Sequence, residues 1–298
     1  MDYKVKSPVL FLVFNRPDTT QKVFDAIKKV KPKKLYVAAD GPRENKEGEK
    51  EKCEEVRNII KQVDWDCKVE TLFREKNLGC RDAVSSAITW FFDNVEEGII
   101  LEDDCLPSTS FFRFCDELLE RYRDDTRVWH IGGTNPLKEK VPNSYYFSKY
   151  NRIWGWATWR RCWENYDKKI IFWPDVKKQD ILLNVASKKE VISFTKKFDA
   201  AYYNKINTWD FQWALIKLLN GLSVIPCVNL VSNIGFSDDA THTKIKNDKL
   251  SDLKRFELDF PLVHPPFYVI NRKMDDLWNK YTKKNNSLLN RILLRLLK

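Results

Sequence analysis

Several features that define other protein classes are missing from this sequence of 298 residues. No segment approaches the roughly 20 consecutive apolar residues that a membrane-spanning helix needs. The N-terminal residues Asp2-Tyr3-Lys4 do not begin the apolar stretch of a signal peptide. The seven cysteines are odd in number and form no Cys-x-x-Cys pair, which argues against a disulfide framework and against a zinc site. We therefore expect a cytoplasmic protein.

The charge is unbalanced, with a formal net charge of +10 at pH 7. A basic chain can bind nucleic acid, an anionic membrane surface or anionic small molecules. No basic motif with interleaved aromatic residues marks a nucleic-acid module, and the lysines are scattered. We expect no nucleic-acid partner.

The C-terminal residues 287–298 are an exception to this scatter, because they are almost all Leu, Ile, Arg and Lys. On a helix, one side would carry Asn290, Arg291, Arg295 and Lys298, and the other side only Leu and Ile. This pattern predicts a basic amphipathic helix that binds an anionic membrane surface, such as the inner face of the plasma membrane, or a partner groove. The same pattern also suits a helix that packs on the protein's own core, and both interpretations stay open.

Apolar runs alternate with amphipathic segments through the first 136 residues. Strands are expected at residues 8–14, 35–39, 67–73, 98–101 and 128–132, and helices at 19–30, 56–63, 81–92 and 111–122. Strands that alternate with helices in this way predict an α/β fold with a mostly parallel, doubly wound sheet.

After Pro136 the chain becomes rich in tryptophan and in helical patterns, with short strands expected at residues 222–226 and 229–234. Trp154, Trp156 and Trp159 lie within one short segment. Such a cluster is more often a packed core than a surface that stacks on a sugar, and both interpretations stay open here.

One predicted strand ends in three consecutive carboxylates, Glu102, Asp103 and Asp104, which we call the acidic tip. Clustered like charges at the end of a buried strand need a partner, and a hard divalent cation is the natural one for oxygen ligands. Ligands of open α/β sheets bind beyond the carboxyl ends of the strands. The acidic tip therefore predicts a metal site, against the alternative of a solvated acidic turn.

Other polar residues follow neighbouring strands and should reach the same edge of the sheet. Asn15 and Arg16 follow the first strand, Asp40 follows the second, and Gly132-Gly133 ends the fifth. A metal site, a basic residue and a lone carboxylate suit a nucleoside diphosphate, whose phosphates the metal would bridge to the protein.

These motifs resemble those of glycosyltransferases with the GT-A fold, especially inverting enzymes similar to N-acetylglucosaminyltransferase I and to glycosyltransferase family 2. Phe14-Asn15-Arg16-Pro17 resembles the opening segment, and Asp40 matches the residue that binds the base. Asn77-Leu78-Gly79 with Arg81 resembles the turn beside the nucleotide. The acidic tip matches the DXD motif, in which Asp104 would bind the metal and Asp103 would lie near the ribose.

The resemblance also implies roles further along the chain. Trp209-Asp210 resembles the segment that supplies the catalytic base, which makes Asp210 the candidate base. A first-turn carboxylate that only stabilises its helix is the alternative. Asn233-Ile234-Gly235-Phe236 with His242 resembles a closing loop, so that His242 would contact the diphosphate or the metal; a solvated loop histidine is the alternative.

The fold and function that the resemblance implies can be stated together. We expect a GT-A-type, Rossmann-like catalytic domain over residues 1–265, divided into a nucleotide-sugar half (1–136) and an aromatic-rich acceptor half (137–265), with a helical tail (266–298). With Mn²⁺ or Mg²⁺, it would transfer a sugar from a nucleotide-diphosphate sugar to a glycan or lipid-linked glycan, as in polysaccharide biosynthesis.

Two other functions compete with this one. A sugar nucleotidyltransferase would share the sheet and the metal, but it usually carries a glycine-rich phosphate loop after the first strand, where this chain has Asn15-Arg16-Pro17-Asp18. A non-catalytic membrane-associated binding protein would use the basic tail and the aromatic cluster.

Two arginines near the predicted site have open roles. Arg16 and Arg81 are candidate phosphate ligands, or else members of surface ion pairs.

Overall fold

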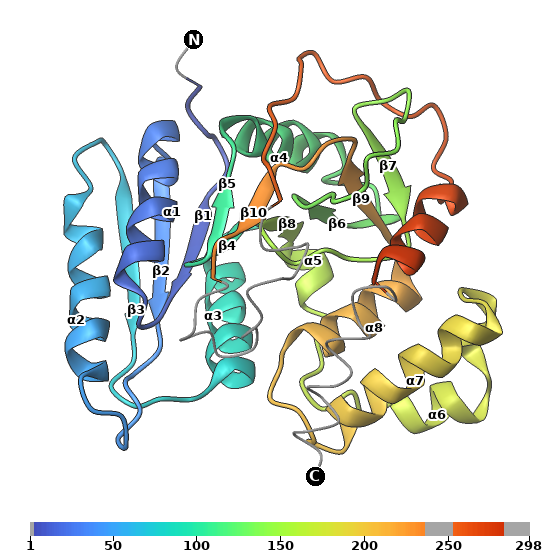
Figure 1. Cartoon of the computed structure of the whole chain (residues 1–298), viewed down its shortest axis with the longest axis horizontal. Coiled ribbons are helices and arrows are strands. Elements are labelled where there is room, and N and C mark those ends of the chain that lie inside the picture. The colour runs from blue at the N-terminus through green and yellow to red at the C-terminus, as the bar shows by residue number, and fades with distance from the viewer. Residues whose placement is uncertain (1–2, 236–252, 283–298) are drawn as a thin grey trace.

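The computed structural model describes residues 3–235 and 253–282, which form helices around one large sheet (Figure 1). The strands are β1 (Val9–Val13), β2 (Lys34–Ala39), β3 (Lys68–Phe73), β4 (Glu97–Glu102), β5 (Cys105–Pro107), β6 (Val128–Gly132), β7 (Tyr145–Ser148), β8 (Trp156–Trp159), β9 (Leu222–Pro226) and β10 (Val231–Asn233). The helices are α1 (Pro17–Val30), α2 (Glu49–Ile59), α3 (Cys80–Asn94), α4 (Thr109–Arg121), α5 (Arg160–Trp163), α6 (Trp173–Lys178), α7 (Lys188–Tyr202) and α8 (Asp210–Asn220), with 3-10 turns η1 (Ile60–Gln62) and η2 (Ile181–Asn184). Residues 272–282 are also helical.

The main sheet has eight strands in the order β3-β2-β1-β4-β8-β6-β9-β7, and β5 pairs with β10 beside it. Four strand pairs are parallel: β2 with β3, β1 with β2, β1 with β4, and β6 with β9. The three pairs that involve β8 or β7 are antiparallel. The predicted α/β class with a mostly parallel sheet flanked by helices is confirmed, and the arrangement is consistent with a GT-A-type fold.

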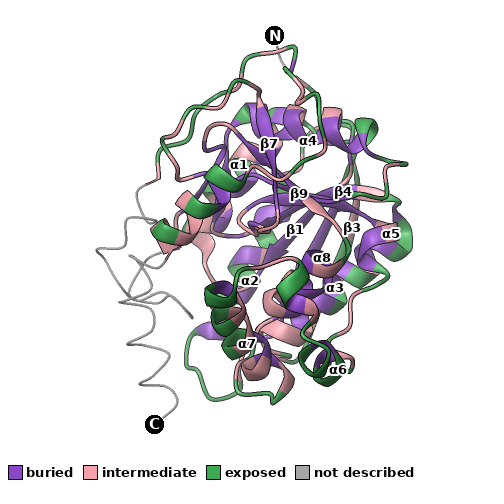
Figure 2. Cartoon of the chain, turned by 90° about the vertical axis from the view of Figure 1, so that its right-hand side faces the viewer, coloured by how far each residue is buried: buried purple, intermediate pink, exposed green. Residues whose placement is uncertain are grey.

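The core lies in the central strands of the sheet, which are buried, while the edge strand β3 has no buried residue and helices such as α2, α6 and α7 expose their outer sides (Figure 2). β1 and β6 are buried along their whole length, which explains why their sequences are apolar without alternation. Residues 3–235 and 253–282 include no helix that is both long enough and apolar enough to cross a bilayer.

The tryptophan cluster resolves the choice that the sequence left open at two of its three positions. β8 runs antiparallel between β4 and β6, and Trp156 and Trp159 are 0% and 1% exposed. The Trp156 ring stacks on the Trp209 ring with centroids 5.6 Å apart, which attaches the start of α8 to the sheet. These two tryptophans are therefore core, and only Trp154 lines a cavity.

Candidate active site

The strand order places the candidate site at a reversal in the sheet. β1 lies between β2 and β4, so the chain winds in opposite directions on its two sides, and the carboxyl ends of β1 and β4 lie next to each other. Leu12 of β1 is in register with Glu102 of β4. Such a reversal opens a crevice at the carboxyl ends of the strands, where open α/β sheets bind ligands.

A cavity of about 500 Å³ opens at this point. Most of the site residues predicted from the sequence line it: Asn15, Arg16, Asp40, Glu102, Asp103, Asp104 and Asp210. The cavity also has lining residues that the sequence did not single out, among them Arg43, Arg74, Cys80, Asn207 and Asn233. Residues from the two predicted halves of the chain therefore meet in one space.

The acidic tip has little positive charge against it. Arg16 donates from Nη1 to Asp104 Oδ2 over 2.9 Å, and the same nitrogen is 3.9 Å from Asp103 Oδ1. Burial, followed by repulsion from Asp104, raises the pKa of Asp103 to about 7. Burial and the neighbouring Asp104, Asp103 and Asp210 raise the pKa of Glu102 well above its ordinary value. The tip would therefore gain from an additional cation.

Arg16 responds to the same field. Burial alone would lower the pKa of its guanidinium, but Asp103 and Asp104 raise it above the ordinary arginine value. Arg16 is therefore a fixed positive charge between the end of β1 and the acidic tip.

Whether the tip suits a divalent metal can be judged from its donors. The described residues include no cluster of three or more His, Cys, Asp or Glu side chains arranged to hold a metal by themselves. A Mg²⁺-type ion that binds with phosphates needs only one or two protein carboxylates, because phosphates and water complete its shell. Asp104, partly exposed on the cavity beside Asp103, meets this requirement. The residues fit a metal that binds together with a diphosphate.

A second chain segment closes against the acidic tip. β10 pairs antiparallel with β5, and the amide of Ile234 donates to the carbonyl oxygen of Asp104 over 2.8 Å. At Gly235 a Cβ atom would lie 2.3 Å from Asp104 Oδ2 and 2.9 Å from Arg16 Nη1. Only glycine permits this approach, which explains its place in the predicted closing segment. Phe236 and His242 of that segment lie outside the described residues.

Asp40 is held tightly by the protein. Its carboxylate accepts hydrogen bonds from the amides of Gly41, Leu78 and Gly79 at 2.9, 3.0 and 3.1 Å, and from Asn77 Nδ2 at 3.0 Å. Burial raises its pKa, and these backbone donors offset part of the rise. Asp40 thus fixes the turn that leads into α3, and its hydrogen bond to a base stays a prediction.

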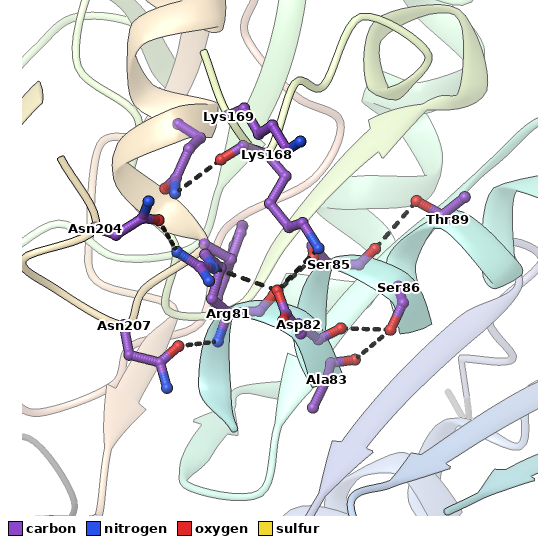
Figure 3. A network of polar contacts seen from close by, with 12 residues as sticks. Arg81, Asp82, Ala83, Ser85, Ser86, Thr89, Lys168, Lys169, Asn204 and Asn207 are labelled. Carbon is purple, nitrogen blue, oxygen red and sulfur yellow. Dashed lines mark hydrogen bonds and ion pairs between the residues drawn. The ribbon is translucent and has the colours of Figure 1, made fainter. Parts of the chain in front are cut away.

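Arg81 does not lie among the residues that line the cavity. Figure 3 shows its guanidinium directed at Asn204, with Nη1 2.6 Å from the Asn204 Oδ1, while its Nε donates to Asp82 Oδ1 over 3.2 Å. These protein partners occupy the side chain, so the predicted contact between Arg81 and phosphate gains no support from the geometry.

Asp210 lines the same cavity, at the first residue of α8. Its carboxylate accepts a hydrogen bond from the hydroxyl of Thr208. Asp210 is also close enough to Glu102 to raise the pKa of that residue. Asp210 is therefore a first-turn carboxylate that also lines the cavity, and its role as the catalytic base stays a prediction.

Some cavity residues could have been found by a stricter use of the strand-end rule. Arg74 comes directly after β3, and Arg43 lies in the loop after β2, where it pairs with the buried Glu49. Glu49 in turn accepts from Asn15 Nδ2 over 2.8 Å. Asn207 follows no strand, and no local pattern marked it.

Comparisons with known proteins give only distant likenesses. No protein-family model matches the sequence, and no curated protein matches it. Among solved structures, HddC from Yersinia pseudotuberculosis is 10% identical with a TM-score of 0.35, over 56% of this chain and 85% of that one. TarS 1–349 from S. aureus is 9% identical with a TM-score of 0.42, over 75% of this chain and 59% of that one.

A third similar structure is 4-diphosphocytidyl-2C-methyl-D-erythritol synthase from Anaerococcus prevotii. It is 8% identical with a TM-score of 0.32, and the match covers 54% of this chain and 76% of that one. Because the identities and TM-scores are this low, these likenesses assign no activity to the chain.

Proposed function

We propose that this chain is a metal-dependent, inverting glycosyltransferase that moves a sugar from a nucleotide-diphosphate sugar to a glycan or lipid-linked glycan. One observation carries the proposal: an acidic tip paired with the Arg16 guanidinium lines a cavity at the reversal of the sheet, and Asp210 lines the same cavity. This combination offers a place for a divalent cation bound to a diphosphate, with a carboxylate beside it.

The donor side of the site would use charge. Asp104 is the proposed metal ligand, with Asp103 and Glu102 beside it and His242 as a further contact to metal or diphosphate. A bound Mn²⁺ or Mg²⁺ would act as a Lewis acid that stabilises the leaving diphosphate. Arg16, already 2.9 Å from Asp104, is placed to donate to the phosphates as well.

The remaining parts of the donor pocket are proposed from position. Asn15 and the turn that Asp40 fixes lie on the side of the cavity formed by β1 and β2, where the nucleoside would bind. Arg16 is the proposed phosphate ligand. Arg81 is not assigned this role, because its side chain hydrogen-bonds to Asn204 and Asp82.

The acceptor side would use Asp210 as a general base. Its carboxylate would take the proton from the acceptor hydroxyl as that oxygen attacks the anomeric carbon, in a single displacement that inverts configuration. The Trp154 side chain lines the same cavity and offers an apolar face for a sugar ring. The basic tail, residues 287–298, would hold the enzyme on the inner face of the plasma membrane near a lipid-linked acceptor.

The direct test is incubation with a panel of nucleotide sugars and Mn²⁺. We expect release of a nucleoside diphosphate from one of them, accelerated by the right acceptor, together with thermal stabilisation by that donor. Turnover that consumes or forms pyrophosphate would instead identify a sugar nucleotidyltransferase. The absence of both turnover and thermal stabilisation across the whole panel would contradict the proposal and would favour a binding protein.

A further inference from the structure

Two parts of the cavity lining meet at the N-terminus of α3: the turn that Asp40 fixes, and the segment from Asn207 to Asp210. The residue that precedes this helix is Gly79, in a backbone conformation (φ 78°) that favours glycine. The first amides of a helix lack partners within the helix, and a side chain at this position usually accepts a hydrogen bond from one of them. Gly79 has no side chain with which to do so.

Asn207, 126 residues away in sequence from Arg81, supplies the missing acceptor. Its Oδ1 accepts from the backbone amide of Arg81, the second residue of α3, over 3.0 Å (Figure 3). Its Nδ2 is 2.7 Å from the place where a Cβ of residue 79 would lie. The glycine therefore leaves room for the asparagine, and the asparagine completes the helix end.

On the nucleotide side, this helix end is already fixed. The carboxylate of Asp40 accepts from the amides of Leu78 and Gly79, so the turn before α3 is tied to the end of β2. Anything attached to the start of α3 is thus held in a defined place relative to the candidate donor pocket.

On the acceptor side, Asn207 begins a run of four residues that all line the cavity and end at Asp210. Trp209 within this run packs on Trp156, and its carbonyl oxygen accepts from the Tyr166 hydroxyl over 3.2 Å. Asn207, the first residue of the run, accepts a hydrogen bond from α3.

We infer that Asn207 is a positioning residue: by capping α3, it sets the place of Asp210 relative to the acidic tip in the shared cavity. The inference rests on the proposed function, in which the separation of base and donor decides the rate of transfer. An error of about 1 Å in such a separation costs on the order of 100-fold in rate. Loss of the Asn207 hydrogen bond should therefore slow the chemical step more than it weakens donor binding.

The same network offers a matched control. Asn204 accepts from the Arg81 side chain over 2.6 Å, close to the cap, but it is not among the cavity residues. Asn204→Ala removes one asparagine bond to Arg81 and leaves the backbone cap in place. Asn207→Ala removes the cap, and Asn207→Asp keeps an acceptor oxygen for it.

The experiment compares these three variants by steady-state kinetics and by amide hydrogen exchange. For Asn207→Ala we expect kcat to fall about tenfold to 100-fold with the donor KM changed less than about twofold, and faster exchange at the Arg81 amide and at residues 208–210. Asn207→Asp should recover most of both properties, and Asn204→Ala should resemble the unmodified protein.

Three results would overturn the inference: unchanged kcat in Asn207→Ala, a donor KM that rises as much as kcat falls, or an equal loss in Asn204→Ala. A failure of the proposed function would look different, because the unmodified protein would then transfer no sugar. In that case hydrogen exchange still decides the matter, since unchanged exchange at Arg81 and residues 208–210 in Asn207→Ala would show that the cap holds nothing in place.

Discussion

Two largely enclosed glutamates, Glu102 of the acidic tip and Glu190 of α7, show how differently this protein treats the same side chain. The Glu190 carboxylate accepts from the Ser187 amide at 2.8 Å, the Ser187 hydroxyl at 2.7 Å and Asn279 Nδ2 at 2.6 Å, and it pairs with Lys149 at 2.8 Å. Although burial opposes this effect, these donors and the hydroxyl of Tyr150 lower the pKa of Glu190 to about 2.

Glu102 has the opposite surroundings. No hydrogen-bond donor to its side chain is found within residues 3–235 and 253–282, and burial with three neighbouring carboxylates raises its pKa. Among the main contributions from the described residues, that of Arg16 lowers the pKa of Glu102. Where the protein supplies the donors, as at Glu190, the carboxylate stabilises the fold. At Glu102 the described residues supply few, which is the basis for proposing that a bound cation brings the positive charge.

The largest effect that this contrast predicts is on activity. Asp210→Asn should lower the rate of sugar transfer by about 100-fold or more, because the acceptor hydroxyl loses its base. Affinity for the nucleoside diphosphate and thermal stability should change little, since the amide keeps the shape of the side chain. Transfer assays and calorimetric binding on the same preparation check both parts, and near-normal turnover would remove Asp210 from the mechanism.

The next largest effect is a loss of folding stability when Glu190, whose carboxylate is hydrogen-bonded by the protein itself, is replaced. Because the folded pKa of Glu190 is about 2, below the ordinary glutamate value of 4.5, the ionised form stabilises the fold above about pH 4.5, and this contribution is lost as pH falls towards 2. Glu190→Gln should lower the free energy of unfolding by about 2 kcal/mol at pH 7. Urea denaturation at pH 7 and pH 3 measures it; an equal difference at both pH values would contradict the assignment.

The same substitution at the acidic tip should have the opposite sign. The folded pKa of Glu102 lies above the ordinary glutamate value of 4.5. Between pH 4.5 and the folded pKa, the folded protein therefore binds more protons than the unfolded chain does, and its stability falls as pH rises through that range. Without divalent cations, Glu102→Gln should therefore raise the free energy of unfolding at pH 8, with the gain vanishing below pH 4.5.

This pair of glutamine variants tests the comparison itself. At pH 8, Glu190→Gln should lower the free energy of unfolding and Glu102→Gln should raise it. Addition of Mn²⁺ with a nucleoside diphosphate should reduce the increase seen in Glu102→Gln, because these ligands stabilise the unmodified protein more than the variant. If both substitutions destabilise the fold to a similar extent, the acidic tip is an ordinary structural cluster.

The smallest effect is expected at Arg81. Arg81→Ala should change the affinity for a nucleoside diphosphate by less than about twofold, because the guanidinium bonds to Asn204 and Asp82 outside the cavity and exposed pairs of this kind contribute little. Arg16→Gln, its matched comparison inside the cavity, should weaken the same binding measurably. Equal losses in the two variants would restore Arg81 to the site.

The sequence was most informative where a pattern is local. The apolar runs before Asn15, Asp40 and the acidic tip identified β1, β2 and β4, and parallel strands necessarily bring their carboxyl ends to one edge. That is why most predicted site residues line one cavity. The buried state of Trp156 and Trp159 was left open, because a strand inserted antiparallel between β4 and β6 has no local signature.

The contacts that could not be predicted from the sequence are those that depend on long-range packing. Asn207 caps a helix that begins at Cys80, and no spacing rule joins residues so far apart. The amides of Gly41, Leu78 and Gly79, which donate to the Asp40 carboxylate, were not predicted either, and the hydrogen bond of Asp40 to a base stays a prediction. A sequence shows that a carboxylate follows a strand, but the donors that reach it come from the rest of the fold.

The central claim is that the acidic tip binds a divalent cation together with a nucleoside diphosphate. Titration of Mn²⁺, followed by electron paramagnetic resonance with and without each nucleoside diphosphate, tests this most directly in the unmodified protein and in Asp104→Asn. We predict that one nucleoside diphosphate tightens Mn²⁺ binding at least tenfold, on the order expected for a shared metal–phosphate shell, and that Asp104→Asn abolishes the gain. Equal Mn²⁺ binding in the two proteins, with that nucleotide present, would contradict the claim.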